Sequence, residues 1–201
     1  MKRMIVGLFT LLSVTAFSQT PVIPNIVFDK KTEYVNKYVE LLDIKDTNAL
    51  ILKEAYGNFW FKGTNATYIV YFNNSSVKGY KVFEPFDSSL KVKVSSMKIK
   101  KSQYHFYWDF LNDCVKNNRF SIDESKLNIT IKEDLEKGTM ETMIVSDGTK
   151  YIFGLFQNNQ IIEYYSYAPK TYIEKGFPGA EERQKLVDLM ADVDSVIKKS
   201  E

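Results

Sequence analysis

The stretch from residue 127 to 168 constrains the fold more than any other, because turn signals recur in it between short segments of alternating polarity. Leu127, Ile129 and Ile131 alternate with polar residues, which is the period of a strand with one buried face. Further strands are predicted at about 139–146, 149–157 and 160–167. The stretch therefore predicts an antiparallel meander.

Two residue pairs punctuate this meander. Asp147-Gly148 precedes the segment 149–157, and Asn158-Asn159 follows it. Both pairs tolerate the positive φ angles that a two-residue hairpin turn requires. Pro169 lacks the N–H that a sheet ladder needs, so the last strand should end before it.

A second hairpin region is predicted upstream. Alternating residues at 66–72 lead through the turn cluster 73–76 into the segment 77–83, and Pro85 closes the pair. The segment 90–100 then carries lysines between valines, an arrangement that protects an edge strand from pairing with another chain.

Three amphipathic helices are predicted from apolar residues at three- and four-residue spacing, near 32–43, 102–117 and 180–198. The segment 170–179 is predicted as a loop. The fold class is therefore α+β, an antiparallel sheet built from the two hairpin or meander regions, with the three helices packed mainly on one face.

The two hairpin regions resemble each other, at about 50–85 and 130–169. Tyr68-Ile69-Val70 leads through an Asn-Asn pair to Pro85, and Tyr151-Ile152-Phe153 leads through another to Pro169. An internal duplication would explain this likeness. Turn-linked amphipathic strands also look alike for physical reasons alone, so both explanations stay open.

The first 18 residues have the pattern of a cleaved signal peptide. Met1-Lys2-Arg3 is basic, an apolar core follows, and Ala16-Phe17-Ser18 has the small residues that precede a cut. Gln19 directly after the cut resembles the leaders of exported proteins of the Bacteroidota. We therefore expect a secreted or periplasmic protein, with residues 19–201 forming one domain and no membrane insertion after cleavage.

Charge gives no general reason to expect a nucleic-acid partner. Cleavage would remove Lys2 and Arg3, so the 27 Lys and Arg residues would fall to 25, equal to the 25 Asp and Glu residues. A local basic patch stays compatible with this balance.

The chain lacks the residues that most catalytic mechanisms require. His105 and Cys114 are the only histidine and cysteine. Nine residues apart on a helix, they face opposite ways and cannot form a nucleophile–base pair. Cys114 lies in an apolar stripe and is predicted to be a buried thiol. No zinc motif or Gly-rich phosphate loop occurs, so we expect no metal and no cofactor.

Carboxylates are the remaining catalytic option, since paired acids alone can hydrolyse glycosides. Glu133, Asp134 and Glu136 crowd one predicted strand end, and Glu163 interrupts an apolar strand. A solvated turn for the first group and an outward strand position for Glu163 are the favoured explanation, and a carboxylate-dependent hydrolase is kept as the alternative function.

Aromatic residues provide the favoured hypothesis. Trp60, Tyr80, Tyr164 and Tyr165 offer flat faces that can stack on a sugar or anchor a protein. Tyr164 and Tyr165 point to opposite sides of their strand, so the exposure of each depends on what covers its face of the sheet. We expect a non-catalytic binding module for an envelope protein or a glycan, unless both faces of the sheet are covered.

Export can be tested by intact-mass analysis. The protein recovered from periplasm or medium should begin at Gln19, as glutamine or pyroglutamate, because the cut should follow Ser18. A membrane-bound form that keeps Met1 would contradict this prediction.

Overall fold

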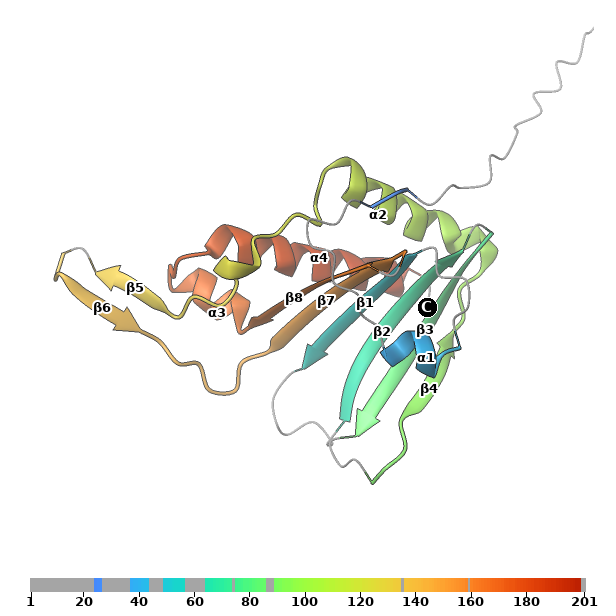
Figure 1. Cartoon of the computed structure of the whole chain (residues 1–201), viewed down its shortest axis with the longest axis horizontal. Coiled ribbons are helices and arrows are strands. Elements are labelled where there is room, and N and C mark those ends of the chain that lie inside the picture. The colour runs from blue at the N-terminus through green and yellow to red at the C-terminus, as the bar shows by residue number, and fades with distance from the viewer. Residues whose placement is uncertain are drawn as a thin grey trace, which may run out of the picture.

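The computed structural model describes residues 24–26, 37–43, 49–56, 64–73, 75–85, 89–134, 136–158 and 160–199. Within these residues the fold is α+β, as predicted. Six antiparallel strands form one sheet in the order β4-β3-β2-β1-β7-β8 (Figure 1). Their bounds are Ala49–Tyr56 for β1, Thr64–Asn73 for β2, Ser76–Pro85 for β3, Lys93–Met97 for β4, Lys150–Gln157 for β7 and Gln160–Tyr167 for β8.

Two tight turns build this sheet where the sequence predicts them. Asn73 pairs with Ser76 at the β2–β3 turn, and Gln157 pairs with Gln160 at the β7–β8 turn. Asn158 has a φ of 52°, the left-handed conformation expected of it. The two hairpins lie on either side of β1, which pairs with β2 and β7. Whether they descend from a duplication stays a prediction.

One face of the sheet is covered by the two long helices, α2 (Tyr104–Lys116) and α4 (Ala180–Lys198). Alternate side chains of β2, β7 and β8 meet these helices in the largest core cluster, with Phe72, Leu111, Phe153 and Leu186 among its fully buried members. The bounds of α4 match the predicted helix 180–198, and those of α2 match 102–117 within two residues.

The other face carries the short helix α1 (Lys37–Leu41) in front of the sheet (Figure 1). Tyr38 packs there against Ile69 and Val82, and its hydroxyl hydrogen-bonds Thr67 at 3.0 Å. Residues 32–36 of the predicted first helix lie outside the described residues. Two of the three predicted helices therefore share one face, and the described part of the third contacts the opposite face.

The predicted four-stranded meander is interrupted after its second strand. Leu127 follows a short 3-10 helix, η2 (Glu124–Lys126). In the described part of the chain, the next strands, β5 (Ile131–Asp134) and β6 (Thr139–Thr142), pair only with each other. They form a separate two-stranded sheet. Alternation predicts a strand with two different faces, but it does not predict which strand it pairs with.

The predicted turn at Asp147-Gly148 is also absent, although Asp147 has the expected positive φ. Gly148 instead donates its backbone N–H to the Tyr167 hydroxyl at 2.7 Å. A Cβ at this position would lie 2.6 Å from the Cβ of Ala168. The glycine therefore allows the segment before β7 to pass close to the end of β8. Because this segment lies against β8, it does not form a hairpin turn between β6 and β7.

The predicted loop 170–179 begins with a helix, α3 (Pro169–Glu174). Pro169 occupies the first turn of α3, where a missing N–H has no cost and the fixed φ suits a helix. Tyr172 and Phe177 then pack edge to face in a small core with Ala168. None of the helices in the described part of the chain is long and apolar enough to cross a membrane.

Cys114 is a free thiol on the buried face of α2 and is fully buried, as predicted. Burial raises its pKa to about 12. The native thiol should therefore react slowly with a thiol reagent and rapidly in denaturant. Because the unfolded thiol ionises near pH ~8.5 and the native one does not, its contribution to the free energy of unfolding should fall as the pH rises above that value.

A Cys114→Ala variant is the control for this titration. It should unfold about 1 kcal/mol more easily at neutral pH, because a small cavity replaces the sulfur. Its stability should change less between pH 8 and 10 than that of the wild type, measured by urea unfolding. Rapid labelling of the folded wild type would contradict the buried position.

Candidate functional site

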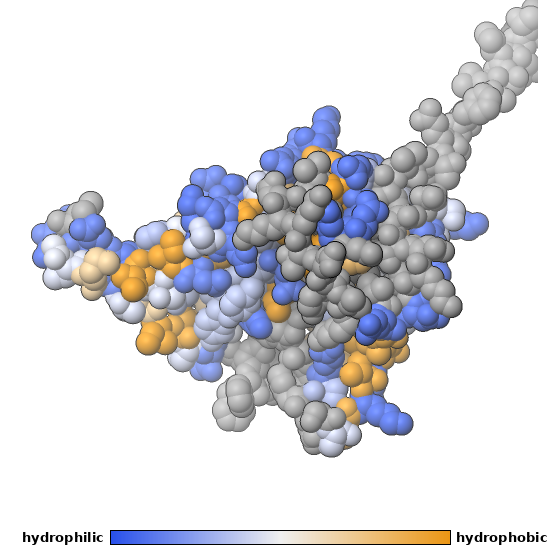
Figure 2. Space-filling model, viewed as in Figure 1, coloured by the Kyte–Doolittle hydropathy of each residue, from blue (hydrophilic) through white to orange (hydrophobic). Residues whose placement is uncertain are grey.

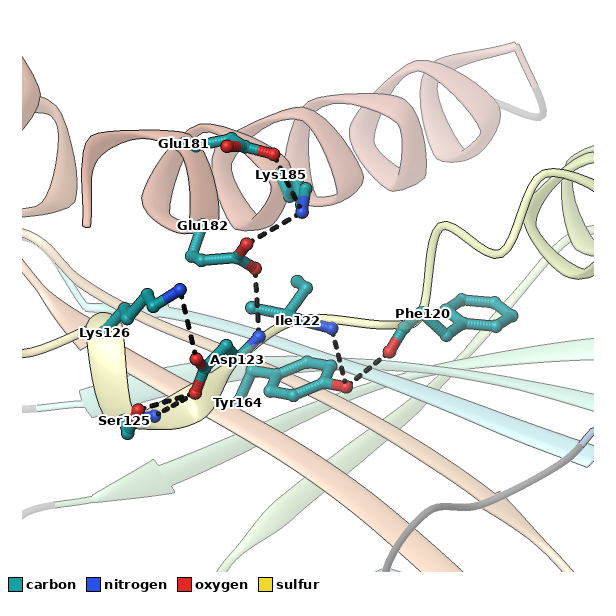
Figure 3. Close-up of polar contacts among 9 residues, drawn as sticks. All are labelled: Phe120, Ile122, Asp123, Ser125, Lys126, Tyr164, Glu181, Glu182 and Lys185. Carbon is teal, nitrogen blue, oxygen red and sulfur yellow. Dashed lines mark hydrogen bonds and ion pairs between the residues drawn. The ribbon is translucent and has the colours of Figure 1, made fainter.

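Tyr164 belongs to the covered face of the sheet. It is buried, its hydroxyl donates to the carbonyl of Phe120, and it accepts the N–H of Ile122 at 3.3 Å (Figure 3). Its role is to hold the chain that leaves α2, and it offers no surface to a ligand.

Tyr165 and Tyr80 both point to the opposite face but are not neighbours. Tyr165 is 39% exposed with the Lys150 ammonium over its ring, and Tyr80 is partly buried beside Ile69 and Val82. Strands are spaced about 4.8 Å apart, so the four steps from β3 to β8 separate the two tyrosines by roughly 20 Å. Trp60 lies outside the described residues. The described part of the chain therefore assembles no patch from the four predicted aromatics.

Two carboxylates of the alternative hypothesis, Glu133 and Glu163, lie in different sheets of the described structure. Glu133 and Glu163 are exposed, on β5 and β8. A polar hollow of about 370 Å³ lies elsewhere, between the end of α2 and α4. Asp188 is the carboxylate among its described lining residues. Across the described residues, no three His, Cys, Asp or Glu side chains are grouped to hold a metal ion.

Each charged side chain of this hollow already has a polar partner, and Asp188 accepts a hydrogen bond from Gln184 at 2.8 Å. Arg119 binds Asp113 at 2.9 Å and Asp192 on α4. Burial opposes the charge of Arg119, but these two hydrogen bonds outweigh it and raise the pKa of Arg119. Lys185 similarly binds Glu181 and Glu182. We therefore interpret the hollow as a structural junction between α2 and α4.

A projecting hairpin is the most distinctive surface of the molecule. We call β5, β6 and the turn between them, residues 131–142, the arm. The arm extends beyond the body of the protein at the left of Figure 1, and hydrophobic residues lie along it and at its base in Figure 2. Its register pairs Ile131 with Thr142 and Glu133 with Met140, which places these four on one face.

Two apolar side chains of the arm, Ile131 and Met140, face solvent, although burial would stabilise them. Met140 is 66% exposed, and Ile131 is also exposed. Since diagonal cross-strand neighbours lie within reach of long side chains, these two form one apolar surface. Ile144 follows at 89% exposure, while Met143 and Val145 beside it pack inward against Tyr172 and its neighbours.

The opposite face of the arm is polar and contacts the body. Lys132 binds Glu141 across the strands at 3.0 Å, donates to the carbonyl of Lys175 at 3.0 Å, and lies 4.9 Å above the Phe177 ring. The Tyr172 hydroxyl donates to the carbonyl of Met143 at 3.0 Å. A two-stranded hairpin is marginal alone, so these contacts at its base are what hold it in one orientation.

The turn of the arm is closed by Asp134. Its carboxylate accepts from the Lys137 ammonium at 2.9 Å and from the backbone N–H groups of Glu136 and Lys137. These bonds, led by the one from the Lys137 side chain, lower the pKa of Asp134. Asp134 therefore has a structural role and is no free catalytic acid.

A buried arginine fixes the root of the arm. Arg183 on α4 is fully buried and donates from Nε to the carbonyl of Leu127 at 2.9 Å and from Nη2 to that of Ile129 at 2.6 Å. Nη1 donates to the carbonyl of Pro178 at 2.5 Å, and the guanidinium lies 4.9 Å from the Tyr172 ring centre. Burial lowers the pKa of Arg183, but a guanidinium stays charged.

The chain between α2 and the arm is held along its length by side chains from β8 and α4. Glu182 accepts the N–H of Asp123 at 2.9 Å and is bound by Lys185 (Figure 3). Burial opposes ionisation of Glu182, yet these hydrogen bonds outweigh it and lower its pKa. On β8, the Ser166 hydroxyl donates to the carbonyl of Leu127 at 2.9 Å.

Sequence reasoning missed both the arm and Arg183. Arg183 stands three, four and seven residues before Leu186, Val187 and Met190. This spacing places it on the buried stripe of the helix and was the available signal. The exposure of Met140 had no such signal, because it depends on where the arm is placed.

Comparison with known proteins adds no assignment, since no protein-family model, curated protein or solved structure matches this chain. The site is therefore defined by its own geometry.

Replacing Arg183 by Met should cost about 3 kcal/mol of unfolding free energy, because buried carbonyl groups lose their donors. Arg119→Met is the matched control. It removes two ion pairs near the surface and should cost about 1 kcal/mol or less. Urea unfolding of both variants measures the difference, and equal losses would contradict the role given to Arg183.

Proposed function

We propose that the protein is a non-catalytic binding module of the bacterial envelope and that it contacts a protein partner through the outward face of the arm. The observation that carries this proposal is the apolar surface of Ile131 and Met140, exposed on a hairpin that projects from the body, with Ile144 exposed two residues beyond the end of that hairpin. Contiguous apolar side chains exposed on a surface often mark an interaction site.

The anchoring of the arm supports this role. A partner that binds a segment already held in one conformation loses less free energy in ordering it. Lys132 and Tyr172 hold the arm from one side and leave its apolar face open. The arm therefore resembles a preorganised contact surface more than a loop that folds on binding.

A protein partner fits this surface better than a glycan. Sugars are usually held by an aromatic face with polar groups around it, and the exposed large side chains of the arm are aliphatic. Of the four aromatics considered for glycan binding, Tyr165 is exposed on β8, away from the outward face of the arm.

The proposed location is the periplasm or the exterior of the cell. This part of the proposal rests on the signal-peptide pattern of residues 1–18, which lie outside the described residues. A partner in the envelope would meet the exported protein there.

Replacing Met140 and Ile144 together by Ser should lower capture of the partner about tenfold or more, because each buried apolar side chain contributes about 1.5–3 kcal/mol. The measurement is quantitative mass spectrometry of proteins captured from a detergent-solubilised envelope fraction. Leu41→Ser on α1 removes another exposed apolar side chain, 46% accessible, and is the control that should capture as the wild type does.

Two further variants decide between partner classes. Trp60→Ala and Tyr165→Ala should leave protein capture unchanged, and a glycan array should show no binding that depends on them. Capture of the same proteins in equal amounts by the wild type and the Met140/Ile144 variant would contradict the arm as the contact surface.

A further inference from the structure

We infer that the β4 edge of the sheet is a second, separate binding surface, which docks on a membrane surface containing anionic phospholipids. We call residues 90–101 the basic edge. It comprises the chain leading into β4, the strand itself and the start of η1 (Lys101–Gln103). β4 is the terminal strand of the sheet, as the sequence predicts for it.

The basic edge concentrates positive charge. It holds five exposed lysines, and no Asp or Glu occurs anywhere from residue 88 to 108. Among the described residues, none of these five lysines is paired with a carboxylate. They are Lys91, Lys93, Lys98, Lys100 and Lys101.

The end of α4 adds to this charge. Gln103 donates to the carbonyl of Lys199 at 3.1 Å, which places the last turn of α4 beside η1. Lys198 and Lys199 are exposed there, and the Lys199 ammonium lies 5.3 Å from the Phe106 ring centre. Two elements far apart in sequence therefore extend one basic surface.

Apolar side chains are exposed on the same edge. Leu90 is 60% exposed, and Val92 and Val94 are exposed as well. Figure 2 shows hydrophobic residues next to hydrophilic ones over the lower end of β4. Lysines alone suffice to protect an edge strand from pairing with another chain. That role does not explain why these three aliphatic side chains are exposed.

The register of β4 fixes this arrangement. Met97 pairs with Gly79, and a Cβ on Gly79 would lie 2.9 Å from both Met97 and Ile99. These two side chains therefore fill the space above the glycine on the helix-covered side. Because successive residues of a strand alternate, Val94 points to the other face, where its partner is Val82.

Aliphatic residues interleaved with lysines match the chemistry of a lipid interface. Apolar side chains enter the boundary between headgroups and acyl chains, while lysines contact phosphate and extend their stems along the surface. A single-stranded nucleic acid would gain little from Leu90 and Val92, since proteins bind its bases by stacking them on aromatic side chains. The charge and the exposed aliphatics together therefore favour an anionic membrane surface. The protein would lie on the membrane without spanning it.

Vesicle sedimentation of the chain from Gln19 to Glu201 tests this inference. The wild type should sediment with vesicles containing phosphatidylglycerol and remain in solution with vesicles of phosphatidylcholine alone. Lys91→Gln with Lys93→Gln should weaken binding about tenfold at low salt and reduce its dependence on salt. Leu90→Ser with Val92→Ser should weaken binding about tenfold at low salt and also at ~0.5 M salt.

The arm supplies the matched control, because Met140→Ser with Ile144→Ser also removes exposed apolar residues and should leave vesicle binding unchanged. Melting temperatures should stay at the wild-type value for all three variants, since the replaced side chains are exposed. Absence of binding to anionic vesicles overturns the inference. So does full binding by the Leu90/Val92 variant, or tighter binding of a single-stranded DNA oligonucleotide than of vesicles at equal salt.

Discussion

The structure depends on one buried cation and the carbonyl groups around it. Arg183 donates to the carbonyls of Leu127, Ile129 and Pro178 and lies beside the ring of Tyr172. A guanidinium without a carboxylate is costly to bury, and here several backbone acceptors and an aromatic face offset that cost. One side chain thereby fixes α4, the chain before the arm and the loop before α4.

This clamp explains why a short hairpin projects in a fixed direction. The chain that reaches β5 has little regular structure of its own, and Tyr164, Ser166 and Glu182 satisfy its backbone groups. The arm then presents Ile131 and Met140 outward. At the β4 edge, the packing of Met97 over Gly79 turns Val94 to solvent in a comparable way. The two proposed surfaces thus lie on separate elements, so one molecule could hold a protein partner while resting on a membrane.

Local patterns were sufficient for the elements but not for their assembly. The helix 180–198 and the turn at Asn158 follow from spacing and turn chemistry, and both are confirmed. The strands around Ile131 and Met140 were expected in the main sheet, yet alternation is the same for a strand in either sheet. Arg183 was overlooked because a charged residue is expected on the solvent side of a helix. Of the predicted aromatics, Tyr164 was proposed as a binding residue. It is buried beneath the segment that follows α2, and no local sequence pattern predicts where that segment lies.

Hydrogen exchange of the isolated protein tests most directly whether the arm is a preorganised surface. The amides paired between β5 and β6 should be protected in the absence of any partner. Arg183→Met should remove this protection while the β7–β8 hairpin keeps its own. Arm amides that exchange in the wild type as fast as those of an unstructured peptide would contradict a preorganised arm.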